Sequence, residues 1–306
     1  MEYNGPMPLG PLLFLCCATA LPAGGESDAY RRVVSQALER AQAKLLADTH
    51  VDVDHSRWED PWVVTSEHYE VRTTRSYLQG RRLADGLELL RAEFVRLLGE
   101  GHEPAGKHKV WVLPGIGDYN RFGQQNGAEH SSILPSFYSS QHAERPVVTY
   151  QNPNEILLGM WATHGALHQY LEETFGPQRL VWVDEGLASY FALFWDWNYG
   201  ITNLEKIEKG STYVPLERLL AEPLQAYAKD PDDRSIELGM LFNFLLNHCE
   251  ATRNSATGDP ATGPFQELLR AAVRGEDVSD SEFLQTFDEA APLLEDDFKS
   301  FDFSKP

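Results

Sequence analysis

The chain contains 306 residues, of which 42% are hydrophobic and 24% are charged, and its formal net charge is -20. This composition is typical of a globular protein with enough apolar residues for a sizeable core. The negative charge argues against nucleic acid and anionic membrane surfaces as partners, because attraction to phosphate groups requires Lys and Arg.

An apolar run near the start, "MPLGPLLFLCCATALPAGG", is too short for a membrane-spanning helix. It ends in small residues, including Ala18-Thr19-Ala20, so residues 1–20 are predicted to be a secretory signal peptide, although no Lys or Arg precedes the run. We therefore expect an exported protein, periplasmic or extracellular, without an integral membrane segment in its mature chain. Cleavage would leave Cys249 as the one remaining cysteine, so that no intramolecular disulfide could form.

Residues 28–150 are predicted to form an α/β subdomain. Apolar residues recur with helical spacing over residues 30–47 and, more strongly, over residues 83–98. Alternation in "WVVTSEHYEVRT", residues 62–73, predicts a strand or a hairpin, and two short strands follow at residues 109–115 and 147–150 with a loop between them. This order predicts a small sheet flanked by helices.

Residues 151–306 are predicted to be mostly helical, which makes the fold class α+β. A first helix is expected to begin with Asn152 as its cap, Pro153 in the first helical position and Glu155 reaching back to the cap. Gly176-Pro177 is expected to end it. Further helices are expected at residues 182–197, 216–220, 235–248, 264–273 and 281–301.

The first of these helices carries His164 and His168. Residues four apart lie on one face of a helix with Cβ atoms about 5–6 Å apart, so the two imidazoles can face one ion. Zinc in an open site takes three protein ligands, and Glu185, which begins the next helix, is the candidate for the third. The histidines are expected to face inward, because apolar residues share their face of the helix: Leu157, Met160, Trp161, Leu171 and Phe175.

The motif His164-Gly165-Ala166-Leu167-His168, followed by Trp182-Val183-Asp184-Glu185-Gly186, resembles the gluzincin group of zinc metallopeptidases. It is most similar to the peptidase MA-like bacterial proteins of uncharacterised function, many of them exported. The likeness covers residues 162–191 and implies a zincin-like arrangement of the helical part. It implies His164, His168 and Glu185 as zinc ligands, with Tyr190 packing beside the site or contacting a ligand.

The sequence departs from that family at Gly165, where the family has the glutamate that accepts a proton from zinc-bound water. General acid–base catalysis contributes about 10²–10⁴-fold in rate, so its loss is expected to be severe. Glycine within a helix also costs about 1 kcal/mol relative to alanine, and the sequence suggests no structural benefit in return.

No other residue is an evident replacement for the missing base. Asp184 neighbours a proposed ligand, but adjacent helical side chains point about 100° apart, so we do not expect it to bind the same ion. We expect it instead to contact one of the ligands, or to be a first-turn acid favoured by the helix dipole. Glu172 and Glu173 are expected to be solvated. The family often has a Tyr near the position of Ser235, and Tyr227 is the one nearby candidate for its role.

Three hypotheses remain open from the sequence. The preferred one is a degenerate gluzincin-type protein, a pseudoenzyme that binds zinc and hydrolyses peptides weakly or not at all. The second is an active exported zinc metallopeptidase with an unconventional base, and the third is a metal-free structural or interaction domain. A peptide or protein ligand is compatible with each. Trp195 and Trp197 are expected in the core, with a carbohydrate or peptide groove as the alternative.

Overall fold

The computed structural model describes His55 and residues 57–102, 106–126, 135–177, 180–196, 231–248, 264–276 and 291–301, with several residues between 200 and 218. The predicted signal peptide, the predicted helix at residues 30–47 and most of the one at residues 216–220 lie outside these residues. So do Trp197, Tyr227 and Cys249.

Five strands form one mixed sheet in the order β1-β2-β3-β5-β4. The inner pairs β2–β3 and β3–β5 are parallel, and the two edge pairs are antiparallel. Of the two alternatives predicted for residues 62–73, the hairpin is the one formed, and both predicted short strands are confirmed. The strands are β1 (Trp62–Thr65), β2 (Tyr69–Thr73), β3 (His108–Leu113), β4 (Ser136–Tyr138) and β5 (Val147–Tyr150).

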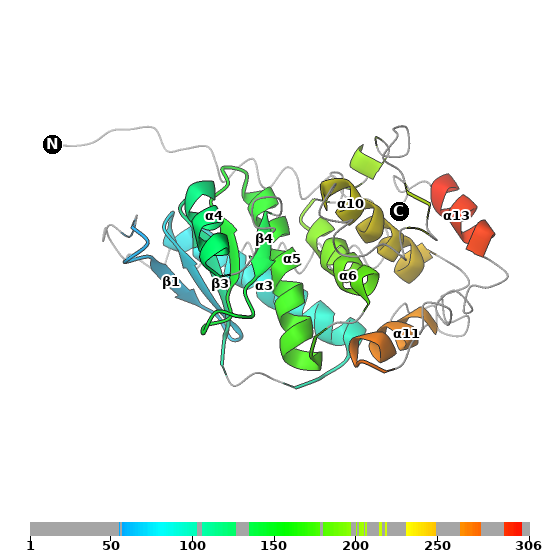
Figure 1. The fold of residues 1–306 in the computed structure, drawn as a ribbon, viewed down its shortest axis with the longest axis horizontal. Coiled ribbons are helices and arrows are strands. Elements are labelled where there is room, and N and C mark those ends of the chain that lie inside the picture. The colour runs from blue at the N-terminus through cyan, green and yellow to red at the C-terminus, as the bar shows by residue number, and fades with distance from the viewer. Residues whose placement is uncertain are drawn as a thin grey trace.

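Helices cover both faces of the sheet (Figure 1). Helix α3 (Tyr77–Leu98) and helix α5 (Glu155–Phe175) pack on one face, where Val147 is buried. Helix α4 (Ile116–Gln125) packs on the other face, where Val148 is buried. Neighbouring valines of β5 thus enter different cores, as the two-residue period of a strand requires.

Two elements, α4 and β4, lie where the sequence suggested only a loop. Helix α4, "IGDYNRFGQQ", contains two glycines and few apolar residues, so its sequence lacks a strong helical pattern. Strand β4 has three residues, which is too short for alternation to be recognised. The expected loop is therefore wrong at these two places.

Helix α5 begins two residues later than a cap at Asn152 would imply. The Asn154 side chain accepts hydrogen bonds from the backbone N–H groups of Ile156 and Leu157, which makes Asn154 the cap. Asn152 instead accepts a bond from the N–H of Asn154 in the preceding turn. The expected end is confirmed, since Gly176 stops the helix in a left-handed conformation with φ of 91°.

The remaining described helices gather on the other side of α5 from the sheet, and the α+β class is confirmed (Figure 1). Helix α6 ends four residues before the predicted end at residue 197. Helix α10 is followed directly by a short π-helix, η1. These elements are α6 (Val181–Leu193), α10 (Pro231–Asn243), η1 (Phe244–His248), α11 (Pro264–Val273) and α13 (Ala291–Ser300).

Helix α5 belongs to two hydrophobic cores. Leu158, Ala162 and Ala166 lie in the core that it shares with the sheet and α3. Leu167 and Leu171 lie in the core that it shares with α6, α10 and α11. The expected subdomain boundary between residues 150 and 151 therefore falls just before a helix that joins the two parts.

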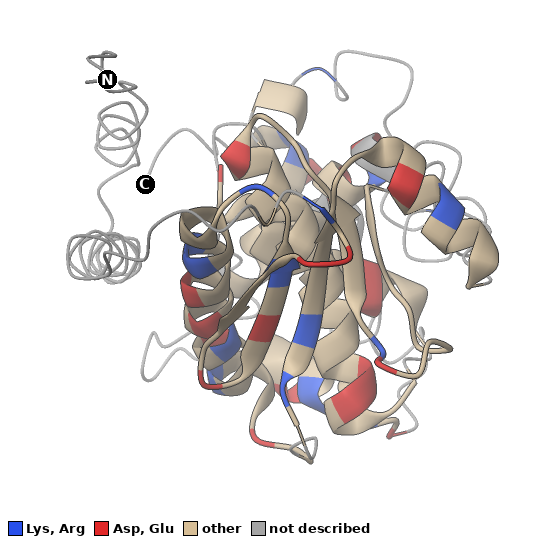
Figure 2. Cartoon of the chain, turned by 90° about the vertical axis from the view of Figure 1, so that its left-hand side faces the viewer, with Lys and Arg blue, Asp and Glu red and all other residues tan. Residues whose placement is uncertain are grey.

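Acidic and basic residues are interspersed over the described elements when the sheet end of the molecule is viewed (Figure 2). Several are paired across strands, as where Glu144 contacts both Arg72 and Lys109. Within the described part of the chain, no helix combines the length and the apolar character needed to cross a membrane.

Candidate metal centre

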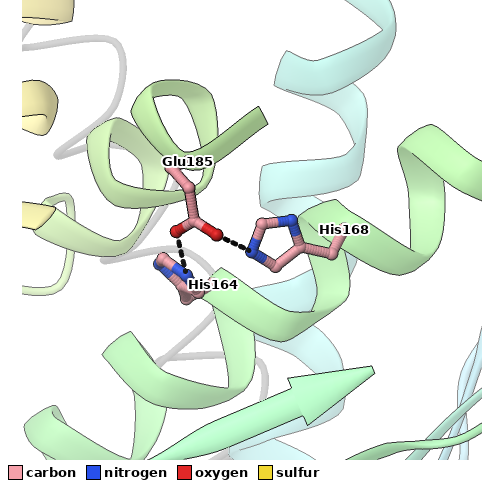
Figure 3. A group of neighbouring side chains, drawn as sticks. All are labelled: His164, His168 and Glu185. Carbon is pink, nitrogen blue, oxygen red and sulfur yellow. Dashed lines mark ion pairs between the residues drawn. The ribbon is translucent and has the colours of Figure 1, made fainter. Parts of the chain in front are cut away.

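Helices α5 and α6 bring His164, His168 and Glu185 together (Figure 3). One ligand atom from each residue can be chosen so that all lie within 4.8 Å of one another. His164 Nε2 lies 3.3 Å from one carboxylate oxygen of Glu185, and His168 Nε2 lies 3.8 Å from the other. Among the described residues this is the group of His, Cys, Asp and Glu side chains that could hold a metal ion.

The histidines lie on the partly exposed stripe of a helix that is otherwise largely buried. Each histidine side chain is 18% exposed and that of Glu185 is 14% exposed, so the group is largely but not fully buried. Leu157 and Trp161 on the same face are also partly buried, and Leu171, seven residues after His164, is fully buried on it. The expected apolar face is confirmed, since its residues belong to or pack against the core that α5 shares with α6 and α10: Leu157, Met160, Trp161, Leu171 and Phe175. The two histidines on that face remain partly exposed.

The donor set and its geometry fit zinc. Zinc binds imidazole nitrogen and carboxylate oxygen at about 2.0–2.2 Å, and tetrahedral angles then place neighbouring ligand atoms about 3.3 Å apart. The two histidine–carboxylate separations, 3.3 and 3.8 Å, are close to that value, and all three ligand atoms lie within 4.8 Å of one another. Three protein ligands of this kind leave one coordination position for water or another ligand, as in catalytic zinc sites.

Strong electrostatic coupling links the three side chains. Burial raises the pKa of Glu185, but the charges and hydrogen bonding of His168 and His164 outweigh it and lower that pKa to about 2. Burial lowers the pKa of His168, but the carboxylates of Asp184 and Glu185 outweigh it and raise that pKa to about 9. A cation bound here must therefore displace a proton, because an imidazolium nitrogen has no lone pair to donate.

Asp184 approaches the other side of the His168 ring. One of its carboxylate oxygens lies 2.8 Å from His168 Nδ1, and its side chain is 27% exposed. The expectation that Asp184 would not point at the same ion as Glu185 agrees with this placement, because Asp184 contacts Nδ1 while Glu185 faces Nε2.

Two aromatic residues near the motif lie in packed surroundings. Tyr190 is 7% exposed, and its ring packs against Phe191 and Phe194. Trp195 donates a hydrogen bond from its indole N–H to the hydroxyl of Thr163, at 2.7 Å. The partly buried Trp195 is thus a packing residue, and the structure does not support the alternative of a ligand groove built on it.

Two glycines make the room that the Trp195 indole occupies. A β-carbon at Gly86 of α3 would lie 2.7 Å from the indole, and one at Gly159 of α5 would lie 2.4 Å from it. Both distances are shorter than real contacts allow, so neither position accepts a larger residue without a shift. The ring therefore fills a slot between α3 and α5.

Gly165 has a structural role that the sequence did not suggest. A β-carbon at this position would lie 2.6 Å from Cγ1 of Val147 on strand β5 and 3.6 Å from the hydroxyl oxygen of Ser136 on β4. The Ser136 hydroxyl donates a hydrogen bond of 2.7 Å to the backbone carbonyl of Trp161. The missing side chain thus lets α5 lie close to the sheet, and the expectation of no structural benefit is wrong.

Glu173 is not solvated, contrary to expectation. Its side chain is 9% exposed, and its carboxylate lies 2.8 Å from His108 Nδ1 and accepts a bond from the Tyr138 hydroxyl at 3.2 Å. Glu172 is 32% exposed and pairs with Arg145. Glu173 therefore ties α5 to strands β3 and β4 and is not available as a base at the histidines.

Sequence reasoning found the three converging residues and expected Asp184 to contact one of the ligands, but it did not identify His168 as that ligand. Adjacent helical side chains point about 100° apart, so Asp184 and Glu185 can face different nitrogens of one ring, but only the packing of α6 against α5 selects His168. Neither a comparison with models of known protein families nor a search of curated protein sequences gives a match to this chain. The resemblance to gluzincins therefore stands on the motif residues.

Proposed function

We propose that this protein is a zinc-binding, gluzincin-like pseudoenzyme with weak or no peptidase activity. The observation that carries the proposal is the meeting of two imidazole nitrogens and one carboxylate in a partly exposed group. Gly165 is the second support, because it leaves no side chain in the position of a general base.

The site is suited to binding a metal ion, but among the described residues it has no side chain placed to accept a proton from a metal-bound water. A zinc ion held by His164, His168 and Glu185 would polarise a bound water or ligand. Glu173 is occupied by its contacts with the sheet, and Asp184 is held at His168 Nδ1, so neither carboxylate is placed to accept a proton from that water. An exported binding protein for a peptide or protein ligand is the role that best suits such a site.

Zinc content is the first test of this function. We expect purified wild-type protein to hold one zinc ion per chain after dialysis, and His164→Ala and His168→Ala to hold none. His142→Ala is a matched control, because His142 is a partly buried imidazole that packs on Trp111 and Phe122 away from the site. Metal-free wild-type protein would contradict the proposal and favour a structural or interaction domain.

Peptide hydrolysis by the zinc-loaded protein is the second test. We expect a rate close to that of the His164→Ala variant with unfolded protein substrates. Robust cleavage by wild type that a chelator abolishes would contradict the proposal and favour the active metallopeptidase with an unconventional base.

A further inference from the structure

Asp184 and Glu185 are consecutive residues that face the two different nitrogens of one imidazole. Asp184 lies 2.8 Å from His168 Nδ1, and Glu185 lies 3.8 Å from His168 Nε2 on the side where His164 converges. Both acids stand in the first turns of α6, where the Asp184 N–H bonds to the carbonyl of Leu180. The same helix end therefore carries both carboxylates.

The contact at Nδ1 decides which nitrogen of His168 carries a lone pair. A neutral imidazole has one N–H donor and one acceptor nitrogen, and a carboxylate can only accept a hydrogen bond. With Asp184 beside Nδ1, the proton belongs on Nδ1 and the lone pair on Nε2 points to the place where the three ligand atoms meet.

We propose that Asp184 is a positioning residue of the metal centre, which fixes the tautomer and the ring orientation of His168 and thereby strengthens zinc binding. This inference rests on the proposed zinc site. Asp184 acts through His168 and does not touch the ion, because its oxygen lies at the ring nitrogen that faces away from Glu185. The same placement keeps it from a water bound to the ion.

The local packing supports a built contact. Asp184 is 27% exposed while His168 is 18% exposed, so the hydrogen bond lies partly shielded between two helices that pack together. A carboxylate partner to a ligating histidine raises the basicity of that ligand, and its loss typically costs 10–100-fold in metal affinity.

The test compares zinc affinity in Asp184→Asn and Glu172→Gln. Glu172 is the matched control, because it is a similarly exposed carboxylate, 32% exposed, one helical turn from His168, but it pairs with Arg145. We expect Asp184→Asn to bind zinc about 10–100-fold more weakly than wild type, and Glu172→Gln to bind it as wild type does. An amide can donate to Nδ1 and so permits the wrong tautomer.

A spectroscopic measurement separates positioning from a loss of stability. In nitrogen-15 spectra of zinc-loaded wild type, His168 should carry its proton on Nδ1 and be metal-bound at Nε2, and this signature should weaken in Asp184→Asn. Asp184→Ala, checked for folding by circular dichroism, should weaken zinc binding to a similar extent.

Two results would overturn the inference. Equal zinc affinity in Asp184→Asn and Glu172→Gln, with zinc still bound by wild type, would remove the positioning role and leave the proposed function standing. Absence of zinc from wild type would remove both.

Discussion

At Gly165 the histidine-bearing helix runs so near the sheet that a β-carbon would lie 2.6 Å from Cγ1 of Val147. The residue that removes the general base of the gluzincin pattern is therefore also the residue that permits this helix–sheet packing. A Gly165→Glu variant made to restore peptidase activity would also be destabilised by the clash with Val147. A test of activity at this position therefore also needs a smaller residue at position 147.

Gly165→Ala is expected to lower the free energy of unfolding by about 1–3 kcal/mol, because it overpacks the contact with Val147. Alanine would otherwise stabilise a helix by about 1 kcal/mol relative to glycine. Urea denaturation measures the change, and a Gly165→Ala/Val147→Ala double variant should recover part of the stability.

Gly117 in α4 is the control, since a β-carbon there meets nothing within 4 Å. Gly117→Ala should leave stability unchanged or raise it by about 0.4–1 kcal/mol. If Gly165→Ala stabilised the protein by the same amount, Val147 and its strand would have moved to make room for the β-carbon. The close contact between α5 and the sheet would then not require glycine at position 165.

Glu237 is a buried carboxyl group in α10, 1% exposed, that accepts bonds from the Val214 N–H and from Arg234. Burial raises its pKa from 4.5 to about 7, and these two partners only partly oppose that rise. The folded state thus binds this proton more tightly than the unfolded state, which makes stability depend on pH.

The stabilisation from protonated Glu237 is fully present below about pH 4.5 and is lost as pH rises through about 7. A shift of this size corresponds to about 3 kcal/mol. We expect the difference in unfolding free energy between wild type and Glu237→Gln to change by about that amount between pH 4.5 and 8, measured by urea denaturation. The exposed Glu267→Gln should show no such change, and a flat difference for Glu237→Gln would contradict the assignment.

At the scale of elements, the candidate metal centre joins α5 to α6. Each helix contributes ligands, so an ion bound there links the helix that packs on the sheet to the helical part of the chain. The ion would bind the folded chain preferentially, because the ligand atoms converge only when the two helices are packed.

Zinc is therefore expected to stabilise the protein in proportion to its saturation. At a free zinc concentration of 100 times Kd, the gain is about 2.7 kcal/mol, which appears as a higher Tm. Differential scanning calorimetry with zinc and with a chelator measures it. His168→Ala should lose the response, and a variant that keeps the full shift would place the binding elsewhere.

The Trp195 indole is a second link between elements, because it follows α6 in the chain and fills the slot between α3 and α5. Trp195→Ala should destabilise the protein by about 3–5 kcal/mol, and Trp195→Phe by about 1–3 kcal/mol through loss of the bond to the buried Thr163. Chemical denaturation gives both values. A loss below 1 kcal/mol for Trp195→Ala would favour an exposed ligand-binding role for the ring.

At the scale of the whole molecule, α5 is the element around which the two cores are built. Its alanines and leucines enter the sheet core on one side and the helical core on another. The histidines lie where α5 faces α6 (Figure 3), beside residues that pack against the helical core, and their side chains remain 18% exposed.

Much of this architecture followed from the sequence. The hairpin and α3 obey clear periodicities, β3 and β5 are short apolar runs, and a spacing of four places His164 and His168 on one face of a helix. The short elements β4 and α4 escaped recognition because they contain too few apolar residues for a period. The cap at Asn154 was missed because two asparagines stand close together and only the backbone geometry selects one.

The sequence by itself determined the α+β class and the three residues proposed as metal ligands, because helical spacing and side-chain chemistry are local properties. Only the tertiary structure decided which stripe of α5 stays open, what Asp184 and Glu173 contact, and why position 165 has no side chain. Those answers depend on how closely α5 approaches α6 and the sheet, and that distance is set by packing between residues far apart in the chain.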